Sequence, residues 1–273
     1  MRLALLVLAV LAAATGAVYG RGQRSAEVPE DPAAAFVQPT GEASARFAGL
    51  VVDSAGMPIA DVYVAMCASA CWPARTDADG RFLYEELPVE RYALDVRGET
   101  VTERALTSVV FPVKLEAGDQ ELGAPIQLQE AVSVPAWDGV GPARFAGLSL
   151  IPSAPVDLSM LDRAGGSAIG GAQVPPSAWP SYRLAADQVP YRPLAMWALR
   201  PFGARAGHLL EVRAAVPAQD LESGTEMAFF SVDPVTGAAE WLGSAVPVGD
   251  EVGTAAGNGI ETLTWIILAA PQR

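Results

Sequence analysis

The chain has 273 residues, of which 51% are hydrophobic and 18% charged, a composition typical of a globular protein rather than a disordered one. Its 18 basic residues stand against 31 acidic residues, which gives a formal net charge of -13. Such a charge repels polyanions, so we expect neither nucleic acid nor anionic lipid as a partner. The length allows one or two domains with a sizeable core.

The first 20 residues have the form of an export signal. Arg2 precedes an unbroken apolar run over residues 3–14, and Thr15 and Ala17 fit the minus-three and minus-one positions of a cleavage site. Together with the small residues that follow, the stretch over residues 3–20 is about 18 residues long, at the lower limit for spanning a bilayer. An uncleaved membrane anchor is therefore the alternative. We therefore expect an exported protein, periplasmic, at the cell surface or extracellular, that contacts a membrane only through such an anchor.

Residues 45–130 are predicted to form a β-sandwich, after a solvated linker over residues 21–44. Asp53 and Gly56 suit a tight turn between two strands, and the pair at residues 79–80, Asp-Gly, is a hairpin signal. Residues 91–97 alternate cleanly between apolar and polar side chains.

This stretch resembles the carboxypeptidase regulatory-like domain, a transthyretin-like β-sandwich that is also grouped with carbohydrate-binding-like folds. The similarity covers about residues 46–129, and Glu90 departs from it because the family usually has Gly at that turn. The residues that carry the resemblance are Gly49, Val51, Asp53, Gly56, Pro58, Ile59, Val62, Val64, Thr76, Asp79, Gly80, Phe82, Leu87, Pro88, Tyr92, Leu94, Val113, Leu115, Gly118, Asp119, Leu122, Ile126 and Leu128.

Residues 131–142 have the Pro and Gly density of a second linker, and residues 143–271 are predicted to form a second β-sandwich. Residues 153–193 are rich in Gly and Pro and poorly periodic, so their path stays open. The hexapeptide Ala-Arg-Phe-Ala-Gly-Leu occurs at 45–50 and again at 143–148, which we interpret as a shared strand start or a coincidence. Apolar runs of strand length cover residues 148–151, 194–199, 208–216, 227–232, 240–248 and 260–268.

This second half resembles ZU5-like β-sandwich modules of bacterial exported proteins, which carry no common active site. The similarity rests on a Pro-Phe-Gly turn, several Asp and Gly turn residues, and two Trp. These residues are Arg200, Pro201, Phe202, Gly203, the turn at 221–224, Asp233, Thr236, Gly237, Trp241, Gly243, Gly257, Asn258, Gly259, Ile260 and Trp265.

The two cysteines, Cys67 and Cys71, are close in sequence, and in an exported protein a local disulfide is expected. Trp72 follows directly, so an exposed indole on this rigid loop is a candidate surface for stacking a sugar ring or an apolar side chain. The alternative is that Trp72 folds back over its own sandwich. Trp197, Trp241 and Trp265 lie within strand patterns and are predicted to be core residues.

Enzyme chemistry finds no support in the sequence. A zinc peptidase or a Ser or Cys hydrolase needs a His in a cluster, and the single His208 alternates with apolar residues, which favours a structural role. Asp77 and Asp79 resemble the start of a calcium loop but fit a hairpin turn better. Glu85 and Glu86 are adjacent on a strand and cannot flank one bond. We expect no catalytic residue, no metal and no cofactor.

The sequence thus favours a non-enzymatic exported structural or protein-interaction module of the cell envelope, with an envelope protein or a glycan as partner. One alternative is a carbohydrate-binding protein that uses the Trp72 loop. A further alternative, an accessory regulatory module of a separate peptidase, rests on the family resemblance alone.

Overall fold

The computed structural model describes residues 44–101, 103–134, 137–159, 168–216 and 225–272, all within one compact unit that covers residues 42–273. Its named elements are strands and two short 3-10 helices, η2 (Gly98–Thr100) and η3 (Pro176–Ala178), which confirms the all-β prediction. In these residues no helix is long and apolar enough to cross a membrane. The predicted signal or anchor, and all but the last residue of the first predicted linker, lie outside the described residues.

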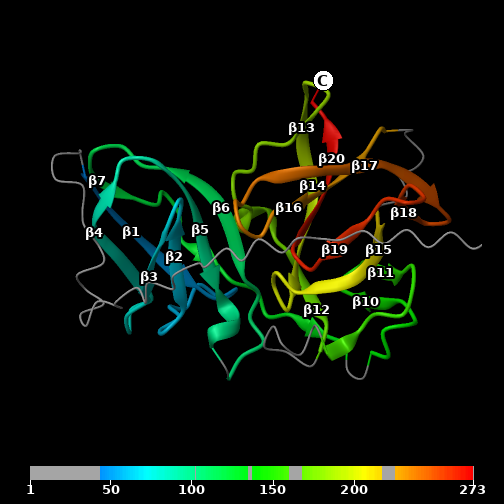
Figure 1. Ribbon diagram of the computed structural model, residues 1–273, viewed down its shortest axis with the longest axis horizontal. Coiled ribbons are helices and arrows are strands. Elements are labelled where there is room, and N and C mark those ends of the chain that lie inside the picture. Colours follow the sequence, from blue (N-terminus) through cyan, green and yellow to red (C-terminus); the bar gives the residue numbers. More distant parts are fainter. Residues whose placement is uncertain (1–43, 102, 135–136, 160–167, 217–224, 273) are drawn as a thin grey trace, which may run out of the picture. The chain divides into compact units, whose positions relative to one another are not determined.

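The first half is a sandwich of two sheets (Figure 1). One sheet has the order β4-β1-β7 with β8 also paired to β1, and the other has the order β3-β2-β5-β6. The strands are β1 (Ser44–Val52), β2 (Tyr63–Cys67), β3 (Cys71–Arg75), β4 (Arg81–Pro88), β5 (Arg91–Arg97), β6 (Val109–Lys114), β7 (Gly118–Glu121) and β8 (Ile126–Gln127).

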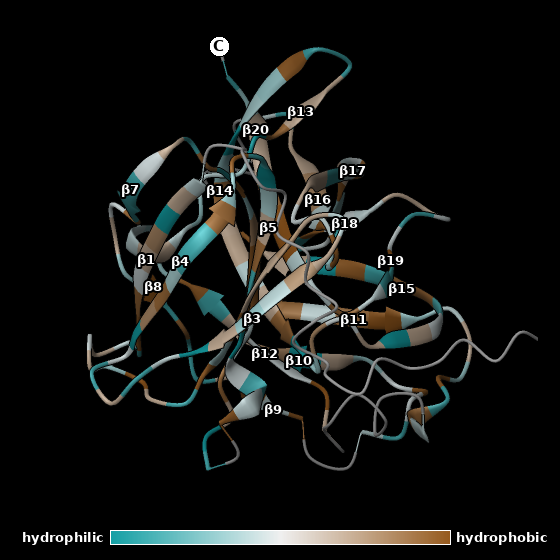
Figure 2. Ribbon diagram, turned by 60° about the vertical axis from the view of Figure 1, so that its left-hand side comes forward, coloured by the Kyte–Doolittle hydropathy of each residue, from teal (hydrophilic) through white to brown (hydrophobic). Residues whose placement is uncertain are grey.

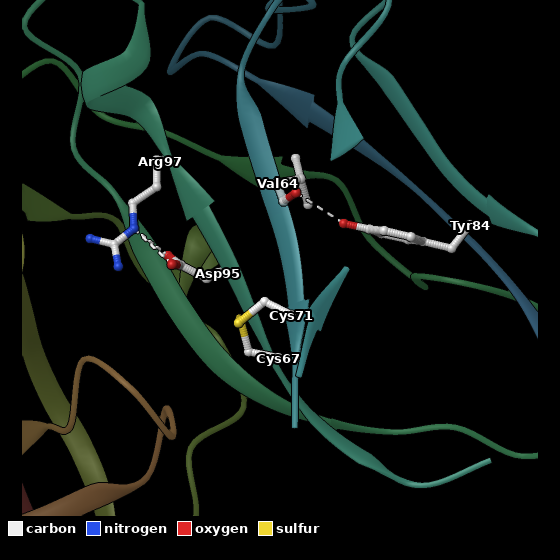
Figure 3. The surroundings of a disulfide bond; sticks show 6 residues. All are labelled: Val64, Cys67, Cys71, Tyr84, Asp95 and Arg97. Carbon is white, nitrogen blue, oxygen red and sulfur yellow. Dashed lines mark hydrogen bonds and ion pairs between the residues drawn. A yellow bond between two sulfur atoms is a disulfide. The ribbon is translucent and has the colours of Figure 1, made fainter. Parts of the chain in front are cut away.

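Alternating apolar residues of both sheets fill the space between them, as the period-two pattern predicts. Phe82 of β4 is 2% exposed and Leu94 of β5 is fully buried. The Tyr84 hydroxyl donates a hydrogen bond of 3.0 Å to the carbonyl of Val64 in the opposite sheet (Figure 3). Glu90 keeps a negative φ, so the chain takes a turn that does not need glycine at this position.

The second half is one twelve-stranded sheet with the order β10-β11-β15-β18-β17-β16-β20-β14-β12-β9, with β13 paired to β14 and β19 to β15. The sheet curls so that Gly171 of β12 lies against the Phe145 ring of β10. The strands are β9 (Val132–Ser133), β10 (Ala143–Phe145), β11 (Leu148–Pro152), β12 (Gly170–Val174), β13 (Ala185–Ala186), β14 (Val189–Arg200), β15 (Arg205–Ala215), β16 (Ala228–Val232), β17 (Ala239–Val248), β18 (Glu251–Thr254), β19 (Ile260–Thr262) and β20 (Trp265–Pro271).

Neighbouring residues of β14 and β20 face two different cores, because side chains alternate along a strand. Trp197 and Ile266 lie in the core inside the curled sheet. Met196 and Trp265 point the other way, into the core that contains the sandwich of the first half. Figure 2 shows the hydrophobic residues along the strands of both halves. The predicted division at residues 131–142 stays a prediction, and a single hydrophobic cluster extends across it.

The apolar run at 260–268 was predicted as one strand and is in fact two. β19 pairs with β15, whereas β20 pairs with β14 and β16. Between them, the Leu263 N–H bonds to the carbonyl of Ala204, and the Thr264 hydroxyl donates to the carbonyl of Val232. Hydrophobicity alone does not reveal this break, because Leu263 and Thr264 are both buried.

Candidate functional site

A pocket of about 170 Å³ lies where the open edge of the first sandwich meets a segment of the second half. β6 contributes Val109 and Phe111, and the chain around β8 contributes residues 124–127. Residues 177–181, which begin within η3, form the opposite side together with Trp265. The full lining is Val109, Phe111, Leu122, Ala124, Pro125, Ile126, Gln127, Ser177, Ala178, Trp179, Pro180, Ser181 and Trp265.

Three aromatic side chains around the pocket are held by hydrogen bonds to backbone carbonyls. The indole N–H of Trp179 donates to Val174 over 2.8 Å, and that of Trp265 donates to Ser108 over 2.7 Å. The hydroxyl of Tyr182 donates to the carbonyl of Val110 over 2.7 Å. Because each polar atom of these rings has its partner, the rings present apolar surface in a fixed orientation.

The chemistry of the lining suits a neutral ligand. None of the thirteen lining residues is ionisable, so the pocket offers neither an acid–base pair nor a charge for binding an ion. The polar groups at its rim are the hydroxyls of Ser177 and Ser181, which are both exposed, and the amide of Gln127. Gln127 is held in place because its Nε2 donates to the carbonyls of Asp53 and Ser54.

Peptide binding by addition of a strand is blocked at this edge. The free side of β6 exposes the carbonyl of Val110, and the Tyr182 hydroxyl already occupies it. Two residues further along β6, Pro112 has no N–H to donate. Since strand addition needs a run of free backbone donors and acceptors, the pocket is suited to a compact group rather than to an extended chain.

The predicted disulfide between Cys67 and Cys71 is present and closes the β2–β3 hairpin, where the two residues are register partners (Figure 3). Trp72 is only partly exposed, and its ring meets that of Tyr92 edge-on at a centroid distance of 5.6 Å. It therefore folds over its own sandwich, as the alternative interpretation had it. Its role in binding a ligand stays a prediction.

Trp241 was predicted to be a core residue, and this was wrong. It is 48% exposed, whereas Trp197 and Trp265 are each 1% exposed as predicted. Trp241 stands opposite the buried Phe230 of β16, but β17 pairs with β18 only from Ala245 onward. The sheet therefore does not continue beyond Trp241 on that side, and its side chain lacks a neighbouring strand to cover it.

The alternation with Leu210 predicted that His208 lies toward an apolar face or its rim, and the structure places it at an exposed position. The register between β15 and β19 shifts between Arg205 and Leu210, so His208 lies in an irregular stretch directly after Gly207, which has a positive φ, whereas Ala206 and Leu210 are both buried. The turns predicted around Asp53 and around residues 77–80 are both present. Asp53 Oδ1 accepts the N–H groups of residues 55 and 57, and Asp77 Oδ1 accepts those of residues 79 and 81.

A charged cluster crosses the junction between the two halves. The Arg97 guanidinium lies 2.7 Å from the Asp95 carboxylate and 4.8 Å from the centroid of the Phe202 ring. The Glu99 carboxylate accepts the backbone N–H of Phe202. Burial raises the pKa of Asp95 and of Glu99 above their ordinary values, although Arg97 opposes the shift at both. The cluster joins the halves and lies apart from the pocket lining.

Sequence reasoning missed the pocket because one side of it, residues 177–181, comes from the segment 153–193, whose path stayed open. A signal was present in the run Pro-Pro-Ser-Ala-Trp-Pro-Ser-Tyr at residues 175–182, where two aromatic residues stand among prolines. The prolines in that run exclude a regular strand, so the presence of Trp179 and Tyr182 there is not explained by strand packing. Both side chains are explained by the packing of this segment against the edge of β6.

No family model matches the chain, and no curated protein matches its sequence. Among solved structures, it is similar to one from Bacteroides uniformis described as "a putative carbohydrate binding protein". The two chains are 9% identical, and the match covers 83% of this chain and 79% of the other at a TM-score of 0.25. At that score the likeness carries no argument about fold or function.

Proposed function

We propose that this protein is a non-enzymatic, exported binding module of the cell envelope, and that its ligand enters the aromatic pocket between β6 and residues 177–181. The observation that carries the proposal is a preformed pocket whose rings are fixed by hydrogen bonds to the backbone. Binding sites for small molecules are mostly apolar and largely preformed, with a few placed polar groups, and this lining has that character.

The volume sets the size of the group that is bound. At about 170 Å³ the pocket is smaller than the roughly 300–1,000 Å³ of typical drug-sized sites. It therefore accepts one ring or one bulky side chain, while the remainder of a larger ligand stays outside.

A carbohydrate is the second candidate, and the rim favours it. A sugar ring offers an apolar face for Phe111 or Trp179, and hydroxyls that can bond to Ser177, Ser181 and Gln127. This differs from binding through the Trp72 loop, because Trp72 does not line the pocket. The resemblance of the first half to the carboxypeptidase regulatory-like domain remains part of this proposal and adds no site residue to it.

The test is a binding screen of the exported protein against a glycan array and a set of small ring compounds. Trp179→Ala is expected to abolish binding. Ala124→Phe should do so as well, because the added ring fills the pocket while the exposed Ala124 contributes no core contact. Trp241→Ala is the matched control, since it removes an exposed indole elsewhere. If both pocket variants bind as the native chain does, the proposal is wrong, and loss of binding only in Trp72→Ala would favour the hairpin loop instead.

A further inference from the structure

A second cavity, of about 210 Å³, lies at one end of the large sheet and has a chemistry unlike that of the aromatic pocket. It is formed where β16 ends, where β17 begins, and along β19. Its lining consists of Ser231, Val232, Asp233, Pro234, Glu240, Leu242, Gly259, Ile260, Glu261, Thr262 and Thr264.

The lining carries three carboxylates, Asp233, Glu240 and Glu261, and no basic residue. None of the three has an ion-pair partner among the described residues. One oxygen of Asp233 is engaged by the turn that follows it, where it accepts the N–H groups of Val235 and Thr236. A concave site that holds like charges without a counter-ion concentrates cations, the more so in a chain with a net charge of -13.

The side chain of Ser231 also points to a ligand at this site. Ser231 is 8% exposed and lines the cavity, on the same face of the sheet as Glu240, its register partner. Its hydroxyl has no hydrogen-bond partner among the residues that the structure describes. The hydroxyl of Thr264, by contrast, is used, because it donates to the carbonyl of Val232. The Ser231 side chain is more than nine-tenths buried and its residue lines the cavity, so its hydroxyl is available to a bound group.

The arrangement favours an organic cation over a metal ion. In the described part of the chain, no group of three His, Cys, Asp or Glu side chains could hold a metal ion, so the carboxylates do not converge on a single point. Leu242, which is partly exposed, adds apolar wall beside the acidic groups. An arginine side chain matches both features, because it combines a hydrocarbon stem with five N–H donors spread over a planar group.

We propose that this acidic cavity binds the arginine side chain of a partner polypeptide. The guanidinium donates to the carboxylates of Glu240 and Glu261, with the Ser231 hydroxyl as a further acceptor, and the stem lies on the apolar wall. This is a site for protein recognition, separate from the aromatic pocket and independent of what that pocket binds.

The full-length exported protein is titrated with Nα-acetyl-arginine amide, and binding is followed by NMR shifts of residues that line the cavity. Millimolar affinity is expected for one isolated side chain. The double variant Glu240→Gln with Glu261→Gln should weaken binding about tenfold or more, because two charge-assisted hydrogen bonds lose their charge. The neutral citrulline derivative, which keeps the shape, should not bind.

The matched control is Asp79→Asn with Glu85→Gln. It changes the net charge by the same amount at two exposed positions of the first half that lie outside the cavity lining. It should alter the affinity by less than about twofold. Equal weakening by the two double variants would show general charge attraction and overturn the proposal. Equal binding of the citrulline derivative, or the absence of saturable shifts at the cavity, would overturn it as well.

Discussion

Trp265 joins the two halves, so replacing it tests whether they unfold as one unit. Its side chain is 1% exposed, and its indole N–H donates to the carbonyl of Ser108, a fully buried residue of the first half. Trp265→Phe removes the donor and leaves that carbonyl without this partner, which costs about 1–3 kcal/mol. The smaller ring also leaves a void, which costs about 1–2 kcal/mol. We expect the free energy of unfolding to fall by about 2–5 kcal/mol in total.

The assay is urea unfolding followed by far-UV circular dichroism, together with amide hydrogen exchange of β5 in the first half and β16 in the second. If the shared core makes the halves cooperative, one transition moves to lower urea with an unchanged slope, and protection falls by the same free energy in both strands. Trp241→Phe, at an exposed position, should change stability by no more than about 0.5 kcal/mol. Two separate transitions, or full protection of β5 while β16 loses its own, would refute the reasoning.

Three further predictions concern stability. The raised pKa of Glu99 makes the folded state bind more protons than the unfolded state, so this residue's contribution is fully present below pH 4.5 and is lost as pH rises through the raised value. Unfolding curves measured across pH should therefore show that Glu99→Gln gains stability relative to the native chain as pH rises. A difference in the free energy of unfolding that stays constant with pH would contradict this. Gly49→Ala should destabilise the chain by about 1–3 kcal/mol in thermal unfolding, because a Cβ there would lie 2.4 Å from the Phe82 ring. Replacing Cys67 and Cys71 together by Ser should lower the free energy of unfolding by about 2 kcal/mol, since the loop that the disulfide closes is short. A loss as large as that expected for a disulfide closing a long loop would contradict this prediction.

Much of the first half could be predicted from local patterns. The turns at Asp53 and at residues 79–80, the alternation along residues 91–97 and the local disulfide each depend on neighbours in sequence, and each is found where it was expected. Trp197 and Trp265 were placed correctly in the core for the same reason, since both lie in apolar stretches of their strands.

The candidate sites could not be predicted in this way, because each depends on which segments meet. The aromatic pocket needs β6 of the first half beside residues 177–181 of the second. The acidic cavity needs Glu240 of β17 near Glu261 of β19, and no local pattern states that these strands come together. Trp241 shows the same limit, since its exposure follows from where β18 stops pairing with β17.

The repeated hexapeptide shows most clearly what local sequence determines and what tertiary contacts determine. At 45–50 the residues Ala-Arg-Phe-Ala-Gly-Leu run straight through β1, and Gly49 lies flat against Phe82. At 143–148 the same residues form a hairpin, in which Ala146 and Gly147 both adopt positive φ and Phe145 pairs with Leu148. The sequence by itself determined an all-β chain, its turns and its disulfide, because these follow from local backbone preference and side-chain period. Only the tertiary structure decided whether this hexapeptide extends or turns, because the partner strands that receive its backbone hydrogen bonds lie elsewhere in the chain.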